Sequence, residues 1–300
     1  MRLEEPPAPE RRGLAELQRS FTRRRAGRVM PGSVSVDEAR AVAIARALKG
    51  VLERGGPLVS MPEYVLPRGL EPGSREHALY LTYVIAVDYM VDAEKLWRRA
   101  RELYERDPTL FTPERVLAMG EEELARALKR LGARFPRRAA SDWKEISRVL
   151  LEKYGGDPRN IAREPLSVGE IVRRLGEFPT LRGEKLSAFY VRVMHETGLF
   201  KVRDPENLGL PVNRQISRFT VYTGVLAGAD YLTVCSRPEL RALVREVWRR
   251  AAAAAGVPAW KLDEPMWNIG SKLCAKDRCL ECPVKELCAR YQGGAKATPR

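Results

Sequence analysis

Residues 274–288 read CAKDRCLECPVKELC and place four cysteines in one short segment near the C-terminus. Their spacing is C-x4-C-x2-C-x5-C. A [4Fe–4S] cluster needs a thiolate on each of its irons, and loops this short allow one compact segment to wrap it. A structural zinc ion also accepts four thiolates, although its sites more often consist of two C-x2-C pairs with a longer insert. The spacing therefore favours an iron–sulfur cluster on Cys274, Cys279, Cys282 and Cys288, with zinc as the alternative.

The remaining cysteine and the absence of apolar runs indicate the compartment. Cys235 directly follows the apolar stretch 231–234, and we expect it to be a small buried hydrophobic residue. Reduced thiols fit an intracellular protein. No apolar run reaches membrane-spanning length, and the N-terminus lacks the apolar region and cleavage site of a signal peptide. These features predict a cytoplasmic protein, associated with the nucleoid in a prokaryote, that does not bind membranes.

The chain is strongly basic, with a formal net charge of +14 and a pI of about 9.8. Such an excess of positive charge attracts polyanions, of which the phosphate backbone of nucleic acid is the commonest. Three Gln and four Asn resemble a thermophile's composition, although a GC-rich genome produces a similar bias. Charge alone leaves the partner open, and a zinc-stabilised helical module that binds RNA is one alternative.

The chain divides by composition into a central unit, residues 36–291, and two tails. Residues 1–35 mix Pro, Gly and clustered Arg and are predicted to form a flexible basic arm, and residues 292–300 a short tail. Asp37 begins a predicted helix with apolar residues at helical spacing, which Gly55 ends. Helical patterns then follow one another between Pro- and Gly-containing breakers, at 75–90, 92–106, 113–118, 121–131, 140–154, 167–175, 183–197, 213–226, 237–255 and 265–273. The sequence therefore predicts an all-α protein.

The helical series followed by the four-cysteine loop resembles the endonuclease III branch of the helix-hairpin-helix DNA glycosylases over residues 75–291. The family's hairpin is matched by residues 178–194, FPTLRGEKLSAFYVRVM. The strip that carries the family's catalytic aspartate is matched by residues 210–226, LPVNRQISRFTVYTGVL. The segment that leads into the cluster is MWNIGSKLC. The first cysteine gap is two residues shorter than the family's usual C-x6-C. The resemblance implies a monomeric, two-lobed, all-α fold with a structural [4Fe–4S] cluster. It also implies that the protein flips a damaged or mismatched base out of duplex DNA and cuts its N-glycosidic bond.

The hairpin departs from the family's Gly-rich LPGVG turn, because residues 178–183 keep a single glycine, Gly183. The amides of Gly183 and Glu184 can still grip a DNA phosphate with help from Arg182 and Lys185. The alternative is an ordinary basic helix start. Lys185 aligns, with one extra residue before it, with the lysine that forms a Schiff base with the sugar in bifunctional members. A solvated helix lysine is the alternative for Lys185.

Asn213 stands where the resemblance places the catalytic aspartate. A neutral amide neither stabilises positive charge on the sugar nor accepts a proton, so this change should lower the rate by orders of magnitude. Asp204 is a candidate for a displaced carboxylate, although an aspartate before Pro205 also suits a turn. The other candidates are Glu206, Asp88 and Asp92. Asn213 also motivates a second function: a glycosylase-like protein that binds lesion-bearing or distorted DNA without cutting it.

The resemblance also predicts which side chains contact DNA. Tyr89 lies near the position where relatives fill the gap left by a flipped base, and an aromatic ring there can stack on bases, although core packing is the alternative. The predicted basic face comprises Arg182, Lys185, Arg214, Lys272, Lys276 and Arg278. His77 and His195 have no metal-like spacing. Burial suits the helix positions of Trp143, Trp248 and Trp267.

Overall fold

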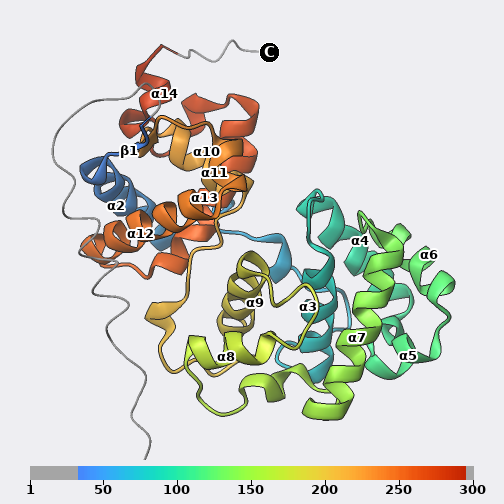
Figure 1. Cartoon of the computed structure of the whole chain (residues 1–300). Coiled ribbons are helices and arrows are strands. Elements are labelled where there is room, and N and C mark those ends of the chain that lie inside the picture. Colours follow the sequence, from blue (N-terminus) through green and yellow to red (C-terminus); the bar gives the residue numbers. More distant parts are fainter. Residues whose placement is uncertain (1–32, 295–300) are drawn as a thin grey trace, which may run out of the picture. The chain divides into compact units, whose positions relative to one another are not determined.

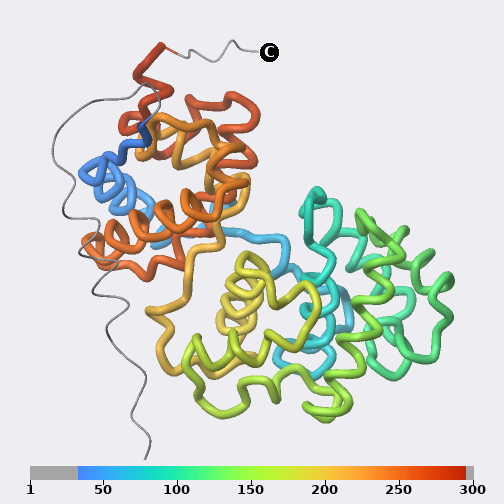
Figure 2. Tube along the Cα trace, viewed as in Figure 1, coloured from blue at the N-terminus to red at the C-terminus, as the bar shows by residue number. Residues whose placement is uncertain are grey.

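The computed structural model describes residues 33–294 (Figure 1, Figure 2). The predicted arm lies outside the described residues except for its last three positions, and so does most of the predicted tail. In residues 33–294 the secondary structure is helical apart from two short strands, β1 (Ser35–Val36) and β2 (Leu226–Ala227). The strands pair antiparallel, with Ser35 opposite Ala227.

The helices of the described chain follow the predicted pattern closely. They are α2 (Glu38–Arg54), α3 (Arg75–Val87), α4 (Ala93–Arg106), α5 (Pro113–Ala118), α6 (Glu121–Leu131), α7 (Pro136–Tyr154), α8 (Val168–Leu175), α9 (Glu184–Glu196), α10 (Arg214–Tyr222), α11 (Tyr231–Ser236), α12 (Pro238–Ala255), α13 (Asp263–Asn268) and α14 (Ala289–Gln292). The all-α prediction is therefore confirmed in outline. Helix α7 begins four residues before its predicted start, because Pro136 is suited to a first helical position. Helix α11 was not predicted, and Asp230 caps it.

Local capping explains where several helices begin. Asp37 accepts the amide of Arg40 at the start of α2, as its sequence position predicts. Ser167 and Glu170 form a capping box at the start of α8. Gly55 follows α2 with a φ of 69°, a conformation that favours glycine. These local signals are why helix positions could be predicted from the chain alone.

The helices form two packed groups. Helices α3 to α9 share one apolar core that runs from Leu70 to Leu208 and also includes Trp260. At its centre, Trp143 packs against Tyr83 and Phe111. The other group joins the two ends of the described chain, with α2 against α12 and α10 against both α11 and α13. In Figure 1 the first group runs from cyan to yellow and the second combines blue with orange and red.

Helices α8 and α9 form the predicted hairpin; they pack on each other, and α9 also packs on α3. In the turn between them, Thr180 has a φ of 62°, a left-handed conformation that a β-branched residue rarely adopts. The hydroxyl of Thr180 is also buried without a hydrogen-bond partner in the described part of the chain. The hairpin turn therefore combines two unfavourable features at one residue.

Candidate active site and cysteine cavity

The N-terminus of α9 presents the hairpin residues that the sequence singles out. Gly183 is the N-cap of α9, and its own amide donates to the Thr180 carbonyl at 3.2 Å. The next amides, including those of Glu184 and Lys185, have no acceptor within a helix. The Glu184 carboxylate forms ion pairs with Arg241 and Arg245. The free amides at this end of α9 therefore belong to the residues just after the glycine.

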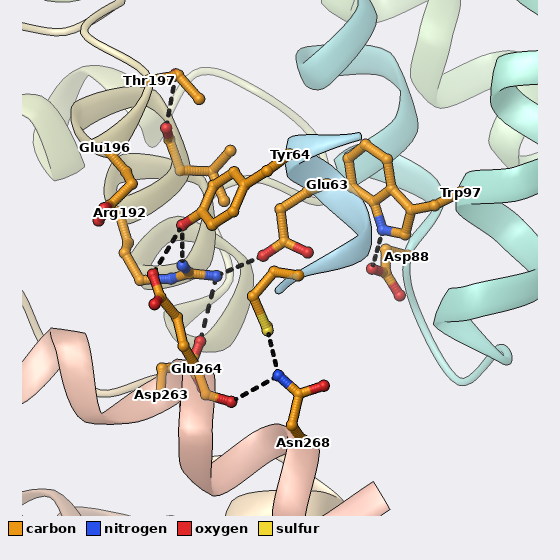
Figure 3. A network of polar contacts seen from close by, with 12 residues as sticks. Glu63, Tyr64, Asp88, Trp97, Arg192, Glu196, Thr197, Asp263, Glu264 and Asn268 are labelled. Atoms are coloured by element: carbon orange, nitrogen blue, oxygen red, sulfur yellow. Dashed lines mark hydrogen bonds and ion pairs between the residues drawn. The ribbon is translucent and has the colours of Figure 1, made fainter. Parts of the chain in front are cut away.

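Lys185 is half-buried near the start of α9, a helix that packs on α3. Asp88 follows the end of α3. There, Asp88 accepts a hydrogen bond from Trp97 Nε1 at 3.2 Å (Figure 3). Burial raises the pKa of Asp88 to about 6, against the lowering effect of the Lys185 charge and of the Trp97 bond. The charge of Lys185 thus affects the ionisation of a carboxyl group that is far from it in the sequence.

Arg192 lies further along α9, is completely buried and is the centre of a polar network (Figure 3). Its Nη2 is 2.7 Å from Glu63 Oε1 and 3.2 Å from Asp263 Oδ2. Its Nη1 donates to the Tyr64 hydroxyl at 2.6 Å, and that hydroxyl lies 3.4 Å from Glu264 Oε1. Arg192 therefore joins α9 to the segment before α3 and to α13.

Asp263 has an unusual environment for a carboxyl group. Its side chain is 2% exposed, and Oδ1 has no hydrogen-bond partner among residues 33–294. Burial raises the pKa of Asp263 to about 7, while Arg192 and Lys185 oppose this rise and Glu63 and Glu264 add to it. Sequence reasoning missed Asp263. The available signal was an acidic pair, Asp263–Glu264, inside the largely apolar stretch that leads to the cysteines.

The other predicted carboxylates have local structural contacts. Asp204 accepts the amide of Val168 at 2.7 Å and the Asn207 side chain at 2.9 Å, so it caps α8 and holds its own turn. Asp92 caps α4. Glu206 is exposed. Of the proposed replacements for a catalytic aspartate, Asp88 is the one that the Lys185 charge affects.

Asn213 caps helix α10. Its Oδ1 accepts the amides of Gln215 at 2.8 Å and of Ile216 at 3.2 Å. An aspartate side chain could accept the same two bonds, because Asn and Asp are equally good N-caps. The residue therefore keeps the structural part of its position and lacks the charge.

Three large apolar side chains are exposed near the ends of α3 and α6. Tyr89 is 51% exposed, Met90 53% and Phe135 54%. Arg134 connects the two loops, because its Nη1 donates to the Met90 carbonyl at 3.4 Å and its guanidinium lies 5.5 Å from the Phe135 ring centroid. Met90 has a φ of 55°. Core packing of Tyr89 is therefore excluded, and sequence reasoning missed its neighbours Met90, Arg134 and Phe135.

The four clustered cysteines line one cavity together with Tyr222, Leu273, Lys285, Arg290 and Tyr291. No group of three or more Cys, His, Asp or Glu in the described residues has the arrangement that holds a metal ion. Burial, with a smaller contribution from neighbouring cysteines, raises the pKa of Cys274 to about 12. Burial also raises the pKa of Cys282, to about 11. Four thiolates this close would repel one another unless cations compensated their charge.

The predicted basic face is mostly accessible. Arg182, Arg214 and Lys276 are exposed, Lys272 is 3.6 Å from Glu94, and Arg278 is paired with Glu281. Two predictions of burial are wrong, because Cys235 and Trp267 are only partly buried. Trp143 and Trp248 are fully buried, as expected.

Among the described residues, no helix combines the length and apolarity needed to cross a membrane.

Comparison with known proteins finds similarity at the level of structure. No family model and no curated protein matches the chain. An endonuclease III trapped in a covalent intermediate with DNA matches with a TM-score of 0.56 and 15% identity, over 86% of this chain and 99% of that one. The 8-oxoguanine DNA glycosylase of Pyrobaculum aerophilum, complexed with 8-oxoguanosine, matches with a TM-score of 0.54 and 16% identity, over 86% and 97%. A thermostable thymine-DNA glycosylase matches with a TM-score of 0.51 and 17% identity, over 85% and 97%. The chain therefore has the fold of the helix-hairpin-helix DNA glycosylases.

Proposed function

We propose that the protein is a DNA N-glycosylase of base-excision repair that acts on damaged or mismatched bases in duplex DNA. The observation that carries this proposal is the position of Lys185 at the start of the second hairpin helix, where its charge acts on the carboxyl group of Asp88. The glycosylase fold supports the reaction class. The exposed cations Arg182, Arg214 and Lys276 suit phosphate contacts, and they favour DNA over a neutral ligand.

The exposed apolar residues suit the opening of the duplex. Tyr89, Met90 and Phe135 occupy two loops that Arg134 ties together. Flipping a base leaves a gap in the stack, and aromatic rings can fill such a gap by stacking on its neighbours. We infer that this loop pair enters the duplex while the amides after Gly183 hold a phosphate.

Lys185 and Asp88 can perform the chemistry at the sugar. As the base departs, positive charge develops on the deoxyribose, and a carboxylate at Asp88 stabilises it. The Lys185 amine can then attack the sugar and form a Schiff base, which leads to cleavage of the strand. In this scheme Asn213 caps α10 and Asp204 caps α8, and Asp88 provides the negative charge that Asn213 lacks.

We further propose that Cys274, Cys279, Cys282 and Cys288 hold a [4Fe–4S] cluster. The fit is supported by the shared cavity and by a donor set of four soft thiolates that need cationic compensation. The cluster would be structural and would order the loop that presents Lys276 and Arg278 to DNA phosphates. Residues 36–291 would then act as one DNA-binding unit in a monomer.

The proposed activity can be tested with anaerobically purified protein. The substrates are duplexes that carry uracil, oxidised pyrimidines, 8-oxoguanine, mismatches or an abasic site, and borohydride traps any Schiff base. We expect the parent to release a base and to be trapped, whereas Lys185→Ala should lose trapping and Asp88→Asn should lose base release. Arg115→Ala, an exposed cation remote from the hairpin in the chain, is the control for charge. A parent that releases no base from any duplex contradicts the proposal.

A second function remains supported by Asn213. Its amide satisfies the helix cap without providing a charge, as expected of a protein that binds distorted DNA and does not cut it. Tight binding without base release by the parent, together with base release by Asn213→Asp, would establish this DNA-reading function. In either case, Tyr89→Ala should weaken binding to an abasic duplex more than binding to an intact one.

A further inference from the structure

Two cations, Arg290 and Lys285, line the cavity of the four clustered cysteines. Arg290 lies on the short helix α14, two residues after Cys288, and its side chain is 30% exposed. The Lys285 ammonium donates to the main-chain carbonyl of Leu280 at 3.2 Å. Arg290, in contrast, is held by other side chains, and these contacts fix where its charge lies.

Two contacts hold the Arg290 side chain. Its Nη2 donates to Asp277 Oδ1 at 2.6 Å, and its guanidinium lies 4.1 Å from the ring centroid of Tyr222. Tyr222 lines the same cavity, and its carbonyl oxygen is 3.3 Å from the sulfur of Cys288. A planar guanidinium that is already stacked and paired loses little freedom when it gains a further acceptor. Arg290 is thus held at the cavity by contacts that need no metal.

The ion pair between Asp277 and Arg290 joins the two ends of the cysteine segment. Asp277 lies between Cys274 and Cys279, whereas Arg290 follows the fourth cysteine. Asp277 has a φ of 53°, a left-handed conformation that aspartate tolerates better than most residues. Its side chain is 63% exposed, about twice the exposure of Arg290. Water therefore screens the charge of the acid more than the charge of the guanidinium.

The chemistry of the cysteines requires such a cation. Four thiolates on a [4Fe–4S] cluster, or on a zinc ion, leave a centre with net negative charge. A buried negative charge costs free energy unless a cation and hydrogen-bond donors compensate it. Arg290 offers both, because only its Nη2 has a hydrogen-bond acceptor within residues 33–294 and its other N–H groups remain available.

We propose that Arg290 compensates the negative charge of the metal centre that the four cysteines hold, and that Asp277 positions Arg290 for this task. The cysteines bind the metal, whereas Arg290 acts on their sulfur atoms through its charge and its N–H groups. Loss of Arg290 should therefore let the metal leave faster. This inference rests on the proposed cluster and assigns it a residue outside the cysteine motif.

The test measures retention of the metal and is independent of DNA repair. The full-length parent, Arg290→Gln, Arg290→Lys and Asp277→Asn are purified without oxygen and analysed for iron and sulfide. An iron chelator is then added, and the visible absorbance of the cluster is followed. Arg159→Gln is the matched control, since Arg159 also pairs with an aspartate, Asp157, at 2.7 Å, is 37% exposed and does not line the cavity. Circular dichroism checks that each variant is folded.

We expect Arg290→Gln to lose iron about tenfold faster than the parent, because partners of metal ligands change metal affinity by about 10–100-fold. Arg290→Lys keeps the charge without the planar guanidinium, so its rate should be intermediate. Asp277→Asn separates position from charge. If charge alone mattered, removal of this acid would slow the loss of iron, whereas we expect faster loss because Arg290 is no longer anchored. Arg159→Gln should match the parent.

Three results overturn the inference: iron loss from Arg290→Gln at the parental rate, equally fast loss from Arg159→Gln, or loss from Asp277→Asn that is not faster than from the parent. A parent without iron and sulfide refutes the proposed cluster instead. If that parent holds zinc, transfer of zinc to a chelator replaces iron loss in the same comparison; a parent without either metal overturns both proposals. If Arg290→Gln does not fold, Arg290→Lys and Asp277→Asn decide, with the same expected directions.

Discussion

Replacing Thr180 with glycine should stabilise the protein, although glycine usually destabilises a fold. Thr180 lies in the hairpin turn with a φ of 62°. A side chain in this region clashes with the backbone, and β branching makes the clash worse. The Thr180 hydroxyl is also buried and lacks a partner in the described chain, so it has lost its bonds to water without compensation. Thr180→Gly removes both costs.

The magnitude follows from four contributions. Relief of the left-handed conformation contributes about 1–2 kcal/mol, and removal of the unpaired hydroxyl about 1–3 kcal/mol. Greater freedom of glycine in the unfolded chain opposes this by about 0.5–1 kcal/mol. Loss of the partly buried methyl group opposes it by up to about 0.8 kcal/mol. We therefore expect the free energy of unfolding to rise by about 2 kcal/mol.

Urea unfolding followed by circular dichroism measures this change, with refolding as the check on reversibility. Thr180→Ala is the matched variant, because it removes the hydroxyl and keeps a Cβ in the left-handed conformation. It should be more stable than the parent and less stable than Thr180→Gly. If Thr180→Gly is less stable than the parent, or if the two variants are equally stable, the turn is not strained as described.

Three further predictions concern the site. The rate of base release should rise with pH through about 6, because Asp88 must be ionised to stabilise a cation. Asp88→Asn should remove this rise and most of the rate, and single-turnover pH profiles of both proteins would show the difference. Arg192→Met leaves Glu63 and Asp263 buried without their cation, so it should lower the free energy of unfolding by about 3–5 kcal/mol. Urea titration measures this loss, and an unchanged unfolding midpoint would contradict it. Cys282→Ser should lose iron and sulfide in elemental and colorimetric analysis, and retained iron would argue against the proposed cluster ligand.

Local signals in the sequence predicted the helices well. Asp37 and Gly55 bound α2 as expected, because capping depends on residues that are neighbours in the chain. Helix α11 was missed because its six residues are too short to show a helical period. Trp267 was expected to be buried from its helix position, but its burial depends on which neighbouring elements cover it.

The candidate site was less predictable, because its members come from distant segments. Glu63, Arg192 and Asp263 have no periodic relation in the chain, and their contacts exist only after α9 and α13 have packed. Asp88 could be named as one of four carboxylates, but the sequence could not select it. The acidic pair at Asp263 was visible in a largely apolar stretch, but a buried charge needs a partner that only the fold identifies.

Asn213 illustrates how a fold can persist while its chemistry changes position. An N-cap needs an oxygen that accepts backbone amides, and both Asn and Asp provide it at similar free energy, so α10 begins at the same residue with either side chain. Catalysis of base release needs a negative charge, which an amide lacks. Because folding does not require that charge at Asn213, a carboxyl group elsewhere must supply it if the protein is an enzyme. Asp88 is the candidate whose ionisation Lys185 already affects, which makes the Asp88→Asn and Asn213→Asp variants the decisive pair.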